Sequence, residues 1–543
     1  MPEAASVALT NPALPGDVPF DTIIYAAAGL VYPASLSQYA IYSTPDPAYI
    51  TPRINIAAFA NLGGGATWPF ASSAVPLNGH VCVPQGRGPF PLVVFAHGNH
   101  QPVENSSPGY LYLCRLLASH GIIAATIDVN FLNGGNFGEN DGRAIVHLEH
   151  LKQFRTWNNT AGHPLQGQVD LNRIMVVGHS RGGEAVGHAS FFNRLSSIQP
   201  DSTSPVVPLD GSGPAPLGPY RFNLNAVAAI APTDGQYQPL TGLTVVPDPY
   251  YVIHGARDGD VTSFPGYHTY NRAHAVDLAN PTVSSGQWKA MLWVYNANHN
   301  QFNSIWASEA AAMPRASQEQ IAKVHFGALA QAVLLRRPEY FAVLEDHAVA
   351  TGWVPAGTEF VSQYQGPDRF FVQHHQEGAA PPVVSLPAQG TVFADSVTAT
   401  RALTALVPGV TTTLTLRLAW SASGGRLLVR VDPATVPAER YKVLSLRVGQ
   451  SVDAANPANR DQDFTLEVSS GSRTLAIAAS SIHRLLYPAA TIGGQKIMMQ
   501  TLRLPVQRLL EEGVDPTDLR AISFVFDRRP AGVVFVGDLQ FST

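Results

Sequence analysis

The pentapeptide Gly178-His179-Ser180-Arg181-Gly182 constrains the fold of this chain more than any other segment. It follows the apolar run 174–177 and precedes residues 183–189, which permit a helix. A strand joined to a helix over so few residues needs a tight, strained turn, and the two glycines remove side chains that would collide with neighbouring elements. Such a turn lifts the Ser180 hydroxyl clear of the sheet and points the first N–H groups of the helix toward it.

Predicted strands and helices alternate from about residue 50 to about residue 340. This alternation indicates an α/β fold, with a mostly parallel sheet and helices on both faces. We expect strands at 53–59, 73–84, 92–96, 122–128, 174–177, 226–231, 250–254 and 291–295. We expect helices at 110–119, 143–157 and 318–335.

The pattern changes after about residue 365, where helical periodicity nearly vanishes and short β-rich runs follow one another, among them 411–418 and 533–541. Closely spaced alternating strands predict an antiparallel β-sandwich, and the region resembles modules of the jelly-roll type. Residues 369–373 are expected to pair with the terminal strand. Since 543 residues are too many for one core, we expect three parts. These are an extended N-terminal arm (1–50), an α/β domain (51–364) and an accessory β-sandwich (365–543).

Composition narrows the classes of partner. The net charge is −5 without a basic stripe, which argues against nucleic acid. No apolar run approaches the roughly 18 residues of a membrane span. The first residues lack the basic and apolar regions of a signal peptide, yet the low charged fraction of 13% and the 43 prolines favour a secreted protein over a cytoplasmic one. Cys82 and Cys114 either pair or remain free buried thiols.

A serine is a poor nucleophile unless a base takes its proton, and that base works best when a carboxylate fixes its tautomer. In an α/β sheet such groups meet in loops at the carboxyl ends of strands. Asp258 follows the predicted strand 250–254, and His299 follows the predicted strand 291–295. We therefore expect Ser180, Asp258 and His299 to form a catalytic triad, with Asp260 or Asp234 as alternative acids.

Residues from about 50 to 340 resemble the α/β-hydrolase superfamily, within the group of dienelactone-hydrolase-like, cutinase-like and platelet-activating-factor-acetylhydrolase-like esterases. His254-Gly255, Asp258 and Val261 match the acid loop His-Gly-x-x-Asp-x-x-Val, and Ala-x-His-x-x-Phe around His299 matches the histidine loop. The triad also has the chain order of that superfamily.

The resemblance extends to the segment His97-Gly98-Asn99-His100, which matches the first oxyanion loop of these esterases. It implies that the backbone N–H groups of Asn99 and Arg181 form the oxyanion hole. Together these features predict a serine esterase that forms an acyl-enzyme on Ser180 with a small-molecule or polymeric ester. A polyester- or carbohydrate-ester-directed enzyme (cutinase-like, acetyl or feruloyl esterase) is the alternative substrate class. A binding protein with a residual hydrolase domain is the alternative of another kind.

Other residues near the predicted site have less specific signals. We expect His100, His179, Asp234 and Tyr237 to contribute to substrate binding. No His-x-x-x-His helix or Cys/His pairing supports a metal, so we expect neither metal nor cofactor. Glu184 either holds Arg181, or lies near the helix dipole, or is structural.

The loop 130–141 either lines the substrate pocket or is an ordinary solvent loop. The region after residue 365 resembles galactose-binding-like modules appended to secreted hydrolases. That resemblance implies carbohydrate or polymer binding, with a structural module as the alternative.

Overall fold

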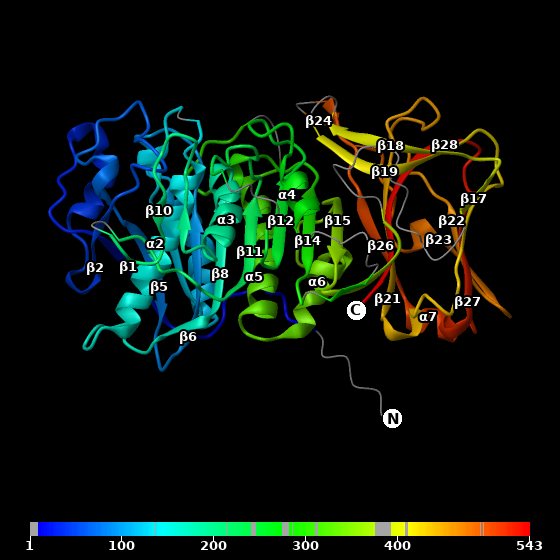
Figure 1. Cartoon of the computed structure of the whole chain (residues 1–543), viewed down its shortest axis with the longest axis horizontal. Coiled ribbons are helices and arrows are strands. Elements are labelled where there is room, and N and C mark those ends of the chain that lie inside the picture. Colours follow the sequence, from blue (N-terminus) through cyan, green and yellow to red (C-terminus); the bar gives the residue numbers. More distant parts are fainter. Residues whose placement is uncertain are drawn as a thin grey trace. The chain divides into compact units, whose positions relative to one another are not determined.

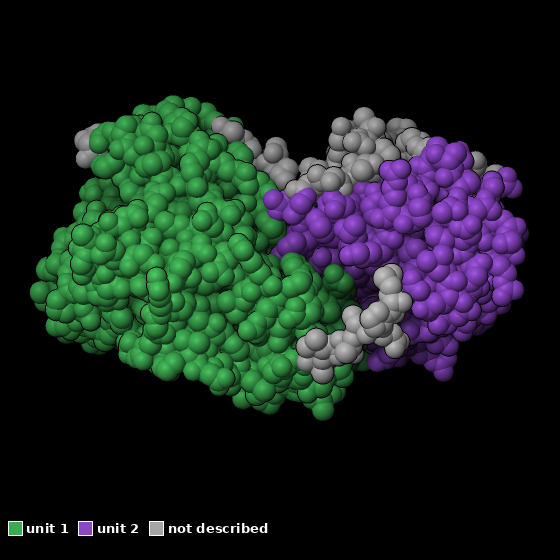
Figure 2. All heavy atoms as spheres, turned by 90° about the horizontal axis from the view of Figure 1, so that it is seen from below, with its two compact units in different colours: residues 1–273, 294–359 green, residues 274–293, 360–543 purple. Residues whose placement is uncertain are grey.

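The computed structural model describes residues 9–135, 137–213, 216–240, 246–273, 282–284, 286–309, 313–374, 392–407, 411–488, 490–491 and 494–543. Figure 2 shows two compact units, one of residues 1–273 with 294–359 and one of residues 274–293 with 360–543. The short stretch before residue 294 therefore groups with the C-terminal unit, which the sequence did not suggest.

The centre of the α/β region is a ten-stranded, mixed and mainly parallel sheet (Figure 1). The pairs β6–β7, β6–β8, β8–β11 and β11–β12 are parallel, whereas β5 pairs antiparallel with β1 and β7. In order across the sheet, the strands are β15 (Phe360–Gln365), β14 (Lys289–Val294), β12 (Tyr250–Gly255), β11 (Leu224–Ile230), β8 (Val169–His179), β6 (Phe90–Ala96), β7 (Ile123–Ile127), β5 (Gly79–Pro84), β1 (Phe20–Ala27) and β2 (Ile50–Thr51).

Helices cover this sheet in two packed pairs. Helices α2 (Asn140–Asn159) and α3 (Arg181–Phe192) pack on each other and on β8, and α1 (Leu111–Ser119) packs on α5 (Arg315–Val333). The ring of Phe326 in α5 contacts Phe95 of β6 and Tyr251 of β12. The predicted α/β architecture is confirmed, and its central strands are buried as continuous apolar runs, as a sheet covered on both faces requires.

The N-terminal segment, expected to be an extended arm, contributes to the sheet over part of its length. β1 pairs antiparallel with β5 from Phe20 opposite Pro84 to Tyr25 opposite Gly79. Residues 1–8 of the expected arm lie outside the described residues. Farther on, the predicted strand 53–59 is wrong beyond Ile54. There the Asn55 side chain accepts a hydrogen bond from the Ala57 N–H (3.0 Å), and this local turn competes with a strand.

The C-terminal region is the predicted antiparallel β-sandwich, made of one seven-stranded and one five-stranded sheet. The first sheet contains β13 (Thr282–Ser284), β16 (Asp368–Gln373), β28 (Gly532–Ser542), β19 (Thr411–Trp420), β18 (Thr398–Val407), β21 (Val443–Gln450) and β26 (Gln500–Pro505). The second contains β17 (Val392–Asp395), β20 (Gly425–Arg430), β27 (Leu519–Phe526), β22 (Thr465–Ser470) and β23 (Thr474–Ala478).

The apolar core of the sandwich lies between these two sheets. Leu418 and Val536 of the first sheet pack in one cluster with Leu427 and Phe524 of the second. The predicted pairing of residues 369–373 with the terminal strand is confirmed, because Arg369 lies opposite Ser542 and Phe370 opposite Phe541. β28 pairs with β16, β19 and β21, so the end of the chain is an interior strand of its sheet.

Two smaller questions raised by the sequence have answers in the fold. Cys82 and Cys114 are both free and buried, so of the two alternatives, a disulfide or free buried thiols, the second holds. Within the described part of the chain, the helices are too short or too polar to cross a membrane.

Candidate active site

The three predicted triad residues follow three strands of the ten-stranded sheet. Ser180 directly follows β8, Asp258 follows β12, and His299 follows β14. The strand order places β12 one strand away from β14 and two from β8. Loops at the ends of neighbouring strands can therefore bring residues together that lie up to 119 positions apart in the chain.

Ser180 occupies the strained turn that the sequence predicts. Its backbone has φ 59° and ψ −123°, a conformation that residues other than glycine rarely adopt. The Ser180 N–H donates to the Ile230 carbonyl of β11 (2.8 Å), and the Ser180 carbonyl accepts from Gly183 (2.8 Å) at the start of α3. Ser180 is 2% exposed, so its hydroxyl lies at the base of the surrounding loops and not on an open surface.

The glycines around Ser180 are required by close approach of the backbone. A Cβ on Gly178 would lie 1.9 Å from the Gly182 carbonyl oxygen, and a Cβ on Gly182 would lie 2.5 Å from the His97 carbonyl oxygen. A Cβ on Gly98 would lie 2.4 Å from the Ser180 Cβ. The loop after β6 is therefore packed directly against Ser180, where an oxyanion loop must lie.

Asp258 and His299 form a buried, hydrogen-bonded pair. His299 Nδ1 lies 2.8 Å from Asp258 Oδ2, and both side chains are almost fully buried. The other carboxylate oxygen, Oδ1, accepts the backbone N–H groups of Asp260 (3.0 Å) and Val261 (2.6 Å). The carboxylate is thus held by its own turn, and it holds the imidazole with Nε2 on the far side of the ring.

Burial and charge act in opposite directions on this pair. Burial alone would lower the pKa of His299, but the charge and hydrogen bond of Asp258, with the charges of Asp260 and Glu309, raise that pKa above its usual value. Burial alone would raise the pKa of Asp258, but His299 lowers it. The pair therefore favours an imidazolium–carboxylate state, which is the state that a general base reaches when it takes a proton.

Of the three candidate acids, only Asp258 bonds to His299 Nδ1 among the described residues. Asp260 Oδ2 lies 3.6 Å from the other nitrogen, Nε2. Asp234 instead accepts two hydrogen bonds from Arg272, at 2.8 Å and 2.6 Å, and lies 3.2 Å from His268. Burial would raise the pKa of Asp234, but its interactions with Arg272, and with His268, lower that pKa to about 2.

The predicted oxyanion loop is braced from behind by His97. Nε2 of His97 accepts the Val129 N–H (3.0 Å), which leaves Nδ1 protonated to donate to the Gly98 carbonyl (2.8 Å). Burial lowers the pKa of His97 to about 3, so the ring stays neutral. In the same loop, the Asn99 side chain accepts the Gly134 N–H (3.1 Å). The loop 130–141 therefore packs against the oxyanion segment over this part of its length.

A buried ionic network that the sequence did not indicate joins this loop to the Ser180 turn. Arg143 of α2 is fully buried and donates to Asn133 Oδ1 (2.7 Å), to Glu139 Oε1 (3.4 Å) and to the His97 carbonyl (3.5 Å). Arg181 donates to the same Glu139 oxygen (2.5 Å). Glu139, and not Glu184, is thus the residue that holds the Arg181 side chain.

His100 and His179, predicted to bind substrate, lie near His299 and make aromatic contacts there. The ring centroids of His179 and His299 lie 4.8 Å apart, and the Tyr110 hydroxyl lies 2.8 Å from His179 Nδ1. His100 stacks on Trp306 at 4.8 Å with an interplanar angle of 9°. Trp306 is fully buried between these rings, and sequence reasoning missed it because no motif marks a tryptophan seven residues after the histidine.

Tyr237 and Glu184 belong to a second buried cluster, around His188 of α3. The Tyr237 ring packs on His188 at 5.0 Å and on Phe192 at 6.0 Å. Glu184 accepts from Asn140 (2.9 Å), Thr233 (2.8 Å) and the Gln236 N–H (2.6 Å), so it ties α3 to the loop after β11. These contacts are those of a structural residue, one of the roles that the sequence left open for Glu184.

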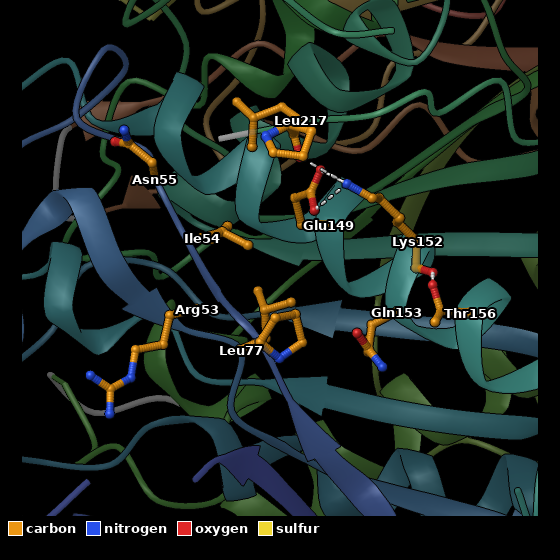
Figure 3. A pocket seen from close by; sticks show the side chains of 11 residues that line it. Arg53, Ile54, Asn55, Leu77, Glu149, Lys152, Gln153, Thr156 and Leu217 are labelled. Atoms are coloured by element: carbon orange, nitrogen blue, oxygen red, sulfur yellow. Dashed lines mark hydrogen bonds and ion pairs between the residues drawn. The ribbon is translucent and has the colours of Figure 1, made fainter. Parts of the chain in front are cut away.

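A cavity of about 360 Å³ lies at the other end of α2, and none of the predicted site residues lines it (Figure 3). Glu149 and Lys152 pair at its wall, 3.1 Å apart. The lining residues are Pro52, Arg53, Ile54, Asn55, Leu77, Glu149, Lys152, Gln153, Thr156, Pro216 and Leu217.

Comparison with known proteins finds a distant, partial relative. No family model matches the chain. Over 134 residues the chain is 29% identical to "Cutinase 2" from Thermobifida cellulosilytica, a stretch that covers 23% of this chain and 43% of that protein. The chain therefore contains a hydrolase-like region that is distantly similar to a cutinase, in agreement with the mainly parallel sheet.

Proposed function

We propose that the protein is a serine hydrolase that cleaves carboxylic esters through an acyl-enzyme on Ser180. The observation that carries this proposal is the buried Asp258–His299 hydrogen bond in the loops after β12 and β14, together with a serine held at positive φ between β8 and α3. The distant similarity to a cutinase supports ester hydrolysis as the reaction.

In the proposed reaction, His299 Nε2 takes the proton of Ser180 Oγ as this oxygen attacks the ester carbonyl. Nε2 is buried and, among the described residues, has no hydrogen-bond partner, so it is available for that proton. The imidazolium then gives the proton to the leaving alcohol. Water enters, loses a proton to Nε2 and hydrolyses the acyl-enzyme, which restores Ser180.

The negative oxygen of the tetrahedral intermediate is assigned to the backbone N–H groups of Asn99 and Arg181. The close packing of Gly98 on Ser180 and the position of Arg181 at the first turn of α3 support this assignment. One such donor is worth about 3 kcal/mol in the transition state. This chemistry requires no metal or organic cofactor.

Substrate class and compartment are extensions of the same proposal. A small-molecule or polymeric ester fits the chemistry; the similarity to a cutinase favours a polyester, and a carbohydrate ester is the alternative. We further propose a secreted protein whose β-sandwich contacts carbohydrate or polymer, with a structural role as the alternative.

The direct test is Ser180→Ala, assayed with p-nitrophenyl esters of several acyl lengths, polyester films and acetylated xylan. We expect turnover to be lost with every substrate that the unmodified protein cleaves, while the thermal unfolding midpoint stays within about 2 °C, because the change removes one small hydroxyl that holds no hydrogen bond to the described residues. Retained turnover in Ser180→Ala would disprove the assignment of the nucleophile.

A further inference from the structure

His299 lies between two carboxylates, and the triad accounts for only one of them. Asp258 bonds to Nδ1 at 2.8 Å, whereas Asp260 Oδ2 lies 3.6 Å from Nε2, the nitrogen that must accept the serine proton. The Asp260 side chain is 62% exposed, so its carboxylate is in contact with water. A negative charge therefore lies beside the reactive nitrogen as well as behind it.

The backbone around Asp260 is fixed by bonds to the triad itself. Asp258 Oδ1 accepts the Asp260 N–H (3.0 Å), and Glu309 Oε2 accepts the N–H groups of Gly259 (2.9 Å) and His299 (3.3 Å). Glu309 thereby joins the acid loop to the histidine loop. The backbone that carries Asp260 is thus held by bonds that also hold the backbone of Gly259 and His299.

The other titratable groups near His299 do not offer a charge to Nε2 at this distance. His179 lies with its ring centroid 4.8 Å from that of His299, and burial, followed by the charge of His299, lowers its pKa well below the usual value. His100 faces the same region, and its pKa is lowered by burial. Glu309 contacts the backbone of His299, and burial raises its pKa.

We propose that Asp260 is a positioning residue that stabilises the protonated Nε2 of His299 and so sets the pH below which the site stops working. This inference rests on the proposed function. Asp260 takes up no proton in the cycle: the proton that leaves Ser180 stays on Nε2, beside the Asp260 carboxylate, until the leaving alcohol takes it. The same attraction holds a proton on Nε2 between turnovers, so the base is blocked at a higher pH than it would be without Asp260.

The test is the pH profile of ester hydrolysis by Asp260→Asn, compared with the unmodified protein and with Asp21→Asn. Asp21 is exposed on β1, six strands from β12, and the control removes the same charge. We expect the acid limb of Asp260→Asn to move to lower pH by about half a unit to one unit, since Asp260 is exposed and screened. At a pH below the limb, the activity of Asp260→Asn relative to its own plateau should then be about threefold to tenfold higher than that of the unmodified protein. Asp260→Glu should restore most of the limb, and Asp21→Asn should not move it.

An acid limb that stays in place in Asp260→Asn, or that moves as far in Asp21→Asn, would overturn the inference. An NMR pH titration of the His299 ring in the same variants measures its interaction with Asp260 independently of ester turnover. The two proposals can therefore fail separately. An unmodified protein without esterase activity refutes the hydrolase, whereas an unchanged His299 titration in Asp260→Asn refutes the role of Asp260.

Discussion

Among the described residues, His188 and His299 are buried and each lies between two carboxylates, but we propose a catalytic role for His299 alone. His188 pairs with Asp141 at 2.9 Å and with Glu184 at 3.5 Å, and His299 pairs with Asp258 at 2.8 Å and Asp260 at 3.6 Å. Burial opposes the charge on both rings, yet their carboxylates raise the pKa of each to about 9.

The difference lies in the partners. Both carboxylates of His188 are buried and bound by backbone N–H groups, Glu184 by Gln236 and Asp141 by Gln238. Asp260 is instead exposed, and the Nε2 of His299 has no hydrogen-bond partner among the described residues. A raised histidine pKa in a buried ion pair therefore does not by itself mark a catalytic residue. We assign the catalytic role to His299 because its Nε2 is the open nitrogen.

The largest effects should separate the two histidines. We expect His299→Ala to lower kcat by on the order of 10⁴-fold, because it removes the proposed base, and also to lower stability, because Asp258 stays buried without its cation. His188→Ala should instead lower the free energy of unfolding by about 3–5 kcal/mol, because it leaves Asp141 and Glu184 buried without their cation. Steady-state kinetics and urea unfolding of both variants measure this contrast; similar kinetic losses in the two folded variants would contradict it.

A smaller effect should separate two buried glutamates. Glu139→Gln weakens the bonds that Arg143 and Arg181 use to position the oxyanion loop, so kcat should fall about tenfold to a hundredfold. Glu184→Gln changes charge and shape in the same way but affects the His188 cluster, so unfolding should change more than kcat. The comparison fails if Glu184→Gln has the greater effect on kcat.

The smallest predicted effect is that activity and stability change in opposite directions as the pH rises. His299 must be neutral to accept a proton, so its raised pKa places the rise of kcat/KM between pH 6.5 and about 9. The pKa of His188 is also raised on folding, so its contribution to stability is complete below pH 6.5 and is lost as the pH rises through about 9. Activity should therefore rise where the thermal midpoint falls. A thermal midpoint in His188→Ala that declines as steeply as in the unmodified protein would refute the assignment to His188.

Much of the architecture was predictable because its signals are local. A few consecutive residues are enough to recognise the glycines beside Ser180, the apolar runs of the parallel strands, and the loops that carry Asp258 and His299. Arg143 and Glu139 were not predictable, because their contact with Arg181 and His97 spans about 40 residues and depends on how α2 packs. Strand β13, which joins the sandwich from residues 282–284, was missed for the same reason.

The central claim is that Ser180 is a nucleophile activated by His299, and its most direct test is labelling by a fluorophosphonate probe followed by peptide mass spectrometry. We predict a single adduct on the peptide containing Ser180 in the unmodified protein, little adduct in His299→Ala, and none in Ser180→Ala. A folded, unmodified protein that remains unlabelled, or an adduct that persists in Ser180→Ala, would contradict the account and favour a binding protein with a residual hydrolase domain.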